Sequence, residues 1–252
     1  MVLRLTSLQR TWEALAHKDP LWAVLTAADR RGNRWDPAEF FATGVQAVDG
    51  ILAHVASLGL EMQRRRALDF GCGVGRLTQA LARHFAEVWG ADIAPSMIEK
   101  ARSYNRHADR CRYVLNETDD LAVFADGRFD FILSLITLQH MSPRFAKGYL
   151  REFVRVLARG GVLVFQLPAE PIAAGANRSQ RLRQVIRRLA PSPLVRLYRR
   201  VRHGHPIDMY GLPREEVESL LRESGVIVVD AVEDSSAGGG WTSFRYCVRK
   251  PS

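Results

Sequence analysis

The feature of this sequence that most constrains its fold is an alternation of short apolar runs with longer segments of helical period. The apolar runs have the length of strands and occupy residues 67–70, 88–91, 112–115, 129–135 and 162–167. Pro95 and Pro143 each begin one of the helical segments, because proline fits the first turn of a helix. Strands that alternate with helices in this way indicate βαβ units in a parallel sheet.

A different pattern follows the fifth apolar run. Pro213 opens a further helix, and strand-like stretches follow at 226–229 and 242–248, with the glycine-rich residues 235–240 between them. Two strands joined by a short flexible segment predict an antiparallel hairpin. The sequence therefore predicts an α/β fold: a Rossmann-like doubly wound sheet of seven strands, mostly parallel with an antiparallel terminal hairpin, and helices on both faces.

Residues 1–60 precede the first strand and are predicted to be helical, with Asp36 as an N-cap and Pro37 as a first helical residue. We expect a helical lid segment over residues 1–60 and a single sheet domain over residues 61–252, since α/β domains of this length are commonly single units. Aromatic side chains of the lid segment either close a site or form a helical core, and the core is favoured. They are Trp12, Trp22, Trp35, Phe40 and Phe41.

Residues 169–211 interrupt the α/β pattern and form a basic insertion. Nine arginines lie from Arg178 to Arg202 with no carboxylate between them, and their charge equals the net charge of +9 of the whole chain. Residues 182–189 and 194–201 have helical apolar spacing, which predicts two short amphipathic helices. A lid over an acceptor pocket is the favoured interpretation. A dock for an anionic substrate or membrane surface is next, and a solvated face is last.

The composition excludes several classes of protein. No apolar run approaches the roughly 18 residues that cross a bilayer, and the first residues lack the basic start and apolar centre of a signal peptide. We therefore expect a soluble, cytoplasmic protein that is at most peripheral to a membrane. The three cysteines, Cys72, Cys111 and Cys247, have no CxxC spacing, which argues against disulfides and a thiolate metal site. The sequence does not indicate an oligomeric state.

A glycine-rich loop follows the first strand and marks a nucleotide site. The strand ends at Asp69-Phe70 and runs into Gly71-Cys-Gly-Val-Gly75, after which a helix begins. Glycines let the backbone turn sharply and approach a ligand, while the first amides of the helix stay free to bind it. About twenty residues later the second strand ends at Asp92, the position from which a carboxylate accepts hydrogen bonds from ribose in doubly wound folds. Arg76 replaces the last glycine of the dinucleotide fingerprint, which disfavours a nicotinamide cofactor.

The Gly-x-Gly-x-Gly run, with its acidic residue two positions upstream, resembles motif I of class I S-adenosylmethionine-dependent methyltransferases. The similarity continues through four further blocks, at residues 87–97, 116–121, 129–140 and 153–165. The resemblance implies S-adenosyl-L-methionine as the cofactor and in-line transfer of its methyl group. It covers about residues 65–170 and carries no information about the acceptor.

The resemblance also implies which residues bind the cofactor. Asp92 is expected on the ribose, Met97 over the adenine, and Glu117 where an aspartate of the family often contacts the adenine amine. The full set is Asp69, Gly71, Cys72, Gly73, Arg76, Asp92, Ile93, Met97, Asn116, Glu117, Thr118, Leu135 and Gln139.

The candidate catalytic residue is His140, because the loop after the fourth strand opens over the site and histidine titrates near neutral pH. The alternative is a histidine that only hydrogen-bonds backbone. His203 and His205, followed by Asp208, offer a second base or metal ligands, although a solvated loop is favoured. Asp119-Asp120 is favoured as an exposed turn rather than as a metal site. The expected lid and substrate residues are Trp35, Phe41, His203, His205 and Tyr210.

The leading functional hypothesis is O-methylation of a small molecule, or of a sugar of a glycan or glycolipid. An RNA methyltransferase that uses the basic insertion is the first alternative, and a non-catalytic methyltransferase-like binding subunit is the second. Nucleic acid is disfavoured as a partner, because no Asn-Pro-Pro-Tyr motif follows the fourth strand, where the chain reads Ser134-Leu-Ile-Thr137.

Overall fold

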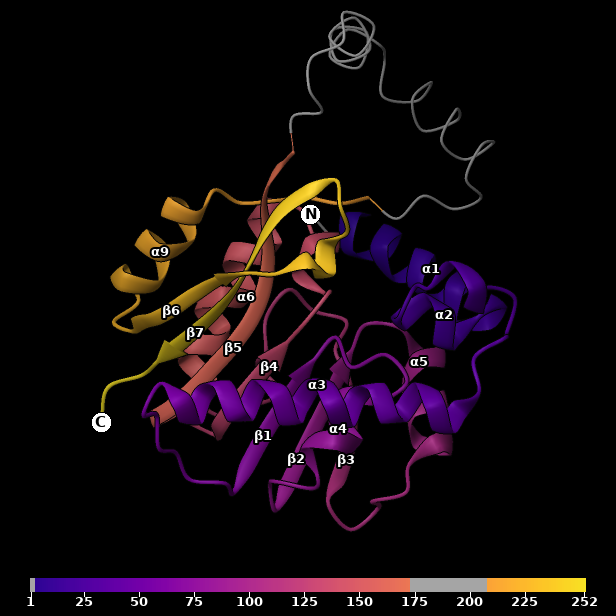
Figure 1. Ribbon diagram of the computed structural model, residues 1–252, viewed down its shortest axis with the longest axis horizontal. Coiled ribbons are helices and arrows are strands. Elements are labelled where there is room, and N and C mark those ends of the chain that lie inside the picture. The colour runs from indigo at the N-terminus through magenta and orange to yellow at the C-terminus, as the bar shows by residue number, and fades with distance from the viewer. Residues whose placement is uncertain (1–2, 173–207) are drawn as a thin grey trace, which may run out of the picture.

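The structure is a computed structural model that describes residues 3–172 and 208–252. A sheet of seven strands forms its centre, in the order β3-β2-β1-β4-β5-β7-β6 (Figure 1). The strands are β1 (Arg66–Phe70), β2 (Glu87–Asp92), β3 (Cys111–Leu115), β4 (Phe129–Ser134), β5 (Leu157–Pro171), β6 (Ile227–Glu233) and β7 (Trp241–Arg249). The helices are α1 (Leu3–Lys18), α2 (Pro20–Val24), α3 (Pro37–Ser57), α4 (Arg76–Leu81), α5 (Pro95–Tyr104), α6 (Pro143–Val156) and α9 (Arg214–Glu223).

The strand pairing confirms the predicted fold class. The first five strands pair in parallel, whereas β7 pairs antiparallel with both β5 and β6. The terminal hairpin therefore closes the sheet, with β6 at its edge. A short 3-10 turn, η3 (Ser235–Ala237), lies in the connection between these two strands.

Successive side chains of the central strands point to opposite faces, so the sheet is covered by helices on both sides. Phe131 and Leu133 of β4 pack in one cluster with α3 and α4, whereas Ile132 packs in the other with α6 and α9. Figure 1 shows α3 crossing the front of the sheet and α6 behind it. None of the described helices is long and apolar enough to span a membrane.

The order of the strands places a site at one edge of the sheet. From β1 the chain proceeds outward through β2 and β3, and then returns to the other side of β1 as β4. Loops that follow β1 and β4 leave in opposite directions at such a switch point and open a crevice at the carboxyl ends of the strands. Asp69 near the end of β1 and Asp92 at the end of β2 both lie at this edge.

Two element boundaries differ from the prediction. The helix that begins at Pro143 ends at Val156, and the fifth strand starts at Leu157 rather than at residue 162, because Leu157 already pairs with Phe129 of β4. The fifth strand then continues to Pro171, since its partner β7 extends to Trp241. β5 therefore enters the predicted 169–211 insertion. The nine arginines of that insertion lie outside the described residues.

The predicted helical segment of residues 1–60 divides into two parts by position. α3 packs on the sheet through Val48, Ile51 and Leu52, so it belongs to the core. α1 and α2 instead lie beyond the carboxyl edge of the strands, near the switch point (Figure 1). Asp36 caps α3 as predicted, its side chain accepting a hydrogen bond of 3.0 Å from the backbone amide of Glu39.

Two glycines in α3 provide a test of how closely this helix packs on α4. A Cβ atom at Gly44 would lie 2.5 Å from the carbonyl oxygen of Arg76, whereas a Cβ atom at Gly50 would meet nothing within 4 Å. We expect Gly50→Ala to raise the free energy of unfolding by about 0.5–1 kcal/mol, because alanine leaves the unfolded chain fewer backbone conformations than glycine does. Gly44→Ala should lower it, since α3 must move away from α4. Urea unfolding measures the change in unfolding free energy of each variant. Equal changes in the two variants would contradict the close packing of α3 on α4 at Gly44.

Candidate functional site

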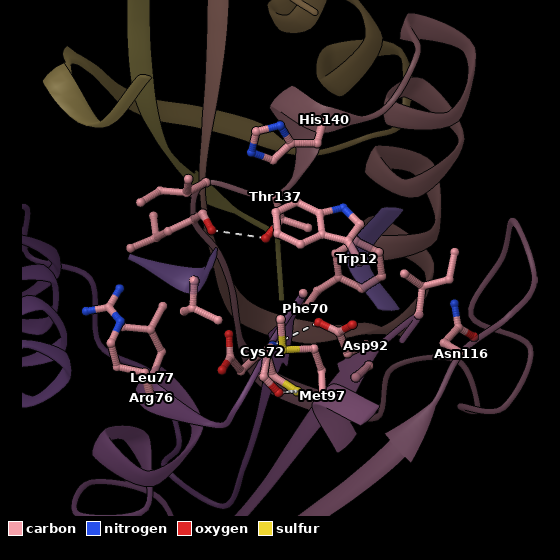
Figure 2. A pocket seen from close by; sticks show the side chains of 18 of the residues that line it. Trp12, Phe70, Cys72, Arg76, Leu77, Asp92, Met97, Asn116, Thr137 and His140 are labelled. Carbon is pink, nitrogen blue, oxygen red and sulfur yellow. Dashed lines mark hydrogen bonds between the residues drawn. The ribbon is translucent and has the colours of Figure 1, made fainter. Parts of the chain in front are cut away.

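A cavity lies at the switch point, at the carboxyl ends of β1, β2 and β4 (Figure 2). Its walls come from these strand ends, from the loops that follow them and from α1 and α2. The lining residues are Leu8, Trp12, Ala23, Val24, Asp69, Phe70, Gly71, Cys72, Gly73, Arg76, Leu77, Ala91, Asp92, Ile93, Met97, Asn116, Leu135, Ile136, Thr137, His140, Met141 and Tyr149. All the predicted cofactor residues lie here except Glu117, Thr118 and Gln139.

The glycine loop forms the floor of the cavity. Gly71, Gly73 and Gly75 have φ angles of +77°, +51° and +85°, in the left-handed region that side chains disfavour. Close packing adds a second constraint, because a Cβ atom at Gly71 would lie 2.2 Å from Thr137 and one at Gly73 would lie 2.4 Å from Val24. The loop is therefore held between α2 and the loop after β4.

Two carboxylates lie beside this loop, of which Asp69 is buried and Asp92 is half-buried. Asp92 accepts hydrogen bonds from the backbone amides of Gly73 (2.8 Å) and Ala94 (2.9 Å), and so joins the glycine loop to the start of α5. Asp69 accepts one from the hydroxyl of Thr78 at 2.7 Å. Burial raises the pKa of Asp69 to about 6, and it also raises the pKa of Asp92, because a low-dielectric site disfavours the charged form. The charge of Asp92 adds to the increase at Asp69.

Arg76, the first residue of α4, is buried on the same wall with only 6% of its surface exposed. Its Nη1 atom donates to the hydroxyl of Thr43 at 3.3 Å, and its buried Nε has no hydrogen-bond partner among the described residues. No ion pair among the described residues includes this guanidinium. Burial lowers the pKa of Arg76, and the charge of Asp69 opposes that effect. The wall thus holds a cation that has no direct anionic partner within the described part of the chain.

α1 is tied across the opening of the cavity by polar contacts. The side-chain amide of Gln9 donates to the backbone carbonyl oxygen of Ile93 (3.2 Å) and to the carboxylate of Glu117 (2.7 Å). One turn later, Glu13 accepts from the backbone amide of Ser96 at 3.1 Å and also from its hydroxyl. Glu117 is therefore exposed and bound to α1 rather than on the cavity wall. Sequence reasoning missed Gln9 and Glu13, although their four-residue spacing around Trp12 marks one face of a helix.

His140 lies at the opposite side of the cavity from Asp92 and Met97, and its ring makes a T-shaped contact with the ring of Trp12 (Figure 2). Its Nδ1 atom is 3.2 Å from the carbonyl oxygen of Asp208, and its Nε2 is 3.2 Å from the side-chain nitrogen of Gln139. Burial lowers the pKa of His140 to about 4, which corrects the expectation of titration near neutral pH. The imidazole is therefore neutral at physiological pH.

The other predicted site residues lie off the cavity wall. The ring nitrogen of Trp35 donates to the carbonyl oxygen of Leu25, and Phe41 packs against Phe40 and Tyr104, so both belong to a helical core. Thr118, Gln139 and Tyr210 also lie away from the cavity wall. Thr118 is exposed, and the side chain of Gln139 is buried against that of Gln166. The backbone amide of Tyr210 donates to the carbonyl oxygen of Gln139. His203 and His205 lie outside the described residues, within which no cluster of three metal-ligating side chains occurs.

Comparison with known proteins connects this cavity to one family. Residues 68–165 match a family model described as a methyltransferase domain. The chain is similar to the ubiquinone biosynthesis O-methyltransferase of Xanthomonas oryzae pv. oryzae strain PXO99A, with 30% identity over 132 residues. The corresponding protein of Xanthomonas campestris pv. campestris strain B100 is 29% identical over the same length. These matches cover 52% of this chain and 54% of each relative, so the chain spans about half the length of the curated relatives it matches.

Solved structures share the fold over a larger part of the chain. Magnesium protoporphyrin IX methyltransferase from Synechocystis PCC 6803 superimposes with a TM-score of 0.64 at 16% identity, covering 97% of this chain and 99% of that one. A methyltransferase from Leishmania major gives 0.65 at 14% identity, covering 97% and 82%. The cyclase SpnF gives 0.57 at 18% identity, covering 82% of each chain. Identities this low show a common fold, which also serves chemistry other than methyl transfer.

The family match falls on β1 to β5, where the glycine loop, Asp69 and Asp92 lie. The resemblance inferred from the glycine loop and the four blocks after it is thus confirmed: residues 68–165 match a methyltransferase domain, and the chain has the fold of solved S-adenosylmethionine-dependent methyltransferases.

Proposed function

We propose that this chain is an S-adenosylmethionine-dependent methyltransferase that methylates a hydroxyl group on a small, largely apolar acceptor. The observation that carries the proposal is a pair of carboxylates on the wall of one cavity: Asp69, which is buried, and Asp92, which is half-buried. Two such carboxylates without a bound cation are costly, because loss of solvent disfavours the ionised form of each. A positively charged ligand would relieve that cost.

S-adenosylmethionine matches this distribution of charge. It carries a positive sulfonium and a positive ammonium group, which the two carboxylates complement. It also carries one carboxylate, which the guanidinium of Arg76 complements through a charge that no ion pair among the described residues uses. A nicotinamide dinucleotide instead carries an anionic pyrophosphate, which Asp69 beside the glycine loop would repel. The charges of the cavity therefore favour the sulfonium cofactor.

The shape of the site is also consistent with the nucleoside part of this cofactor. A carboxylate has about four lone-pair positions, and the amides of Gly73 and Ala94 use two of those on Asp92, which leaves acceptors for ribose hydroxyls. Ile93 and Met97 supply apolar surface beside Asp92 for a purine ring. Gln9 reaches the same place from α1, and we infer that α1 and α2 form the lid of the cofactor site.

The acceptor side of the cavity is mostly apolar. Leu8, Trp12, Ile136 and Met141 line it, and the hydroxyl of Thr137 already donates to the carbonyl oxygen of Leu135 at 3.0 Å. A sugar with several hydroxyl groups would need several polar partners, whereas an aromatic ring with one reactive hydroxyl needs few. The function named for the Xanthomonas relatives, O-methylation in ubiquinone biosynthesis, supports an acceptor with one reactive hydroxyl on an aromatic ring. A sugar acceptor is the weaker candidate.

When bound, S-adenosylmethionine supplies an electrophilic methyl group on its sulfonium sulfur. The residues of this chain then have three tasks: to align the acceptor oxygen with that group, to exclude water and to remove the hydroxyl proton. Trp12 and α1 cover the cavity and exclude water. His140 is neutral, so its unprotonated ring nitrogen accepts the proton of the acceptor hydroxyl.

Two further parts of the proposal concern partners. The nine arginines from Arg178 to Arg202 support contact with an anionic acceptor or with the surface of a membrane, in a protein that is otherwise cytoplasmic. An RNA acceptor draws support from the same arginines, but the apolar acceptor wall disfavours it. The SpnF likeness keeps a cofactor-binding protein without methyl transfer as the second candidate function.

Binding of the cofactor is the first test. We expect the protein to bind S-adenosylmethionine and its demethylated product, and we expect Asp92→Ala to weaken binding at least roughly tenfold, because hydrogen bonds to a charged group contribute about 1.5–3 kcal/mol. Titration calorimetry measures the affinity, with the exposed Asp109→Ala as the matched control. A folded wild-type protein with no affinity for either ligand would refute the proposal.

The raised pKa of Asp69 predicts how stability depends on pH. The folded state holds the proton more tightly than the unfolded state, so between about pH 4 and pH 6 stability falls as the pH rises. Asparagine keeps an acceptor for Thr78 but does not titrate. From about pH 5 to about pH 7.5, Asp69→Asn should gain about 1.4 kcal/mol of unfolding free energy relative to wild type. Urea unfolding of both proteins at the two pH values measures this gain. Asp109→Asn, at an exposed position, is the control and should show no such gain.

Acceptor preference and the role of His140 are tested together. We expect methyl transfer to a phenol that carries an apolar tail, and no transfer to a monosaccharide. His140→Ala should lower kcat on the phenol by about 10²–10⁴-fold, the usual contribution of a general base. His84→Ala, which removes a histidine outside the cavity, is the matched control. Mass spectrometry of the products would reject the phenolic class if only sugars were methylated.

A further inference from the structure

A buried side-chain amide on β5 forms hydrogen bonds with the loop that carries His140. Gln166 is completely buried, and its side-chain oxygen accepts a hydrogen bond of 3.1 Å from the backbone amide of Ile136. Its side-chain nitrogen donates to the side-chain oxygen of Gln139 at 3.2 Å and to the hydroxyl of Ser243 at 2.6 Å. Both polar atoms of Gln166 are therefore used, and they join β5 to the loop after β4 and to β7.

The contact with Ile136 fixes the direction of every hydrogen bond that follows. A backbone amide can only donate, so the Gln166 oxygen must face Ile136 and its nitrogen must face Gln139. Gln139 must then turn its own oxygen toward Gln166 and its nitrogen toward His140. An amide nitrogen can only donate, which means that Nε2 of His140 must be the acceptor.

The other end of the chain of hydrogen bonds requires the same state of the imidazole. Nδ1 of His140 lies 3.2 Å from the carbonyl oxygen of Asp208, which can only accept, so Nδ1 carries the proton. A neutral imidazole has one proton and one lone pair. The backbone amide of Ile136 and the carbonyl oxygen of Asp208 therefore leave the lone pair on Nε2.

A rotated Gln139 amide would reverse this result. If Gln139 presented its oxygen to His140, Nε2 would need a proton to avoid the repulsion of two lone pairs, and the imidazole could no longer act as a base there. Nothing about Gln139 alone selects one orientation, because its amide ends have nearly the same shape. The selection comes from Gln166, through the bond that Gln166 makes with the backbone.

The backbone at Ile136 supports a functional reason for this arrangement. Ile136 has a φ angle of +57°, which is a rare conformation for a β-branched residue, and it lines the cavity. Strained residues of this kind persist only where neighbouring groups hold them, and they concentrate at functional sites. Gln166 holds this one, and with it the loop that leads to His140.

We propose that Gln166 is a positioning residue, which fixes the orientation of the Gln139 amide and thereby keeps the lone pair of His140 on Nε2, ready to accept the proton of the acceptor hydroxyl. An incoming hydroxyl replaces the Gln139 amide as the donor to Nε2, and the proton moves from the hydroxyl oxygen to this nitrogen. The catalytic part of the inference rests on the proposed methyl transfer. The assignment of the tautomer does not.

The experiment is nitrogen-15 NMR of the histidine side chains, with His140 assigned by its loss in His140→Ala. We expect the wild-type protein to show His140 protonated at Nδ1. Gln166→Met keeps the length of the side chain but removes the hydrogen bonds, so a population protonated at Nε2 should appear. In the same variant, kcat should fall roughly 10- to 100-fold while the affinity for S-adenosylmethionine changes by less than about twofold.

Gln79→Met is the matched control, since Gln79 is another buried glutamine, which accepts from the backbone amide of Arg106 and lies off the cavity wall. It should leave the His140 spectrum unchanged. Protonation at Nε2 in the wild-type protein would overturn the inference even if Gln166→Met failed to fold. An unchanged tautomer in a folded Gln166→Met would also overturn it. Absence of methyl transfer with the expected tautomers would instead count against the proposed function alone.

Discussion

The hydrogen bonds of Asp92 connect the parts of the structure on which the cavity depends. One carboxylate oxygen accepts from the glycine loop after β1, and the other accepts from the residue that precedes α5. The loop can reach this carboxylate because its glycines adopt left-handed backbone angles and because parallel strands bring the ends of β1 and β2 side by side. The positions of Val24 of α2 and Thr137 of the loop after β4 follow from this arrangement, since both pack on the loop.

The cavity concentrates groups that reduce the stability of the ligand-free fold. Asp69 and Arg76 are buried, Asp92 is half-buried, and Ile136 has a strained backbone. Each is costly in the absence of a ligand, and each is explained by what the proposed cofactor or acceptor would supply. The core on both faces of the sheet is apolar and well packed, which allows the fold to accommodate these local costs.

The two sides of the cavity differ in how their polar groups are arranged. On the proposed cofactor side, backbone amides and a hydroxyl donate hydrogen bonds to the two carboxylates. On the acceptor side the amides of Gln166 and Gln139 form a directed chain of hydrogen bonds that ends at a neutral imidazole. This division suits a reaction in which one partner carries positive charge and the other must lose a proton.

The sequence by itself determined the class of fold and the common location of most residues that we propose bind the cofactor. Strand period, helix caps and the glycine loop are local patterns, and the switch-point rule then places Asp69, Asp92 and Met97 together. Local patterns could not separate the lid helices from α3, because amphipathic helices look alike whether they cover a sheet or a cavity. They also could not reveal Gln9, Gln166 or the lowered pKa of His140. These depend on contacts between residues far apart in the chain, such as Gln166 with Ser243, and on burial, which only the tertiary structure decides.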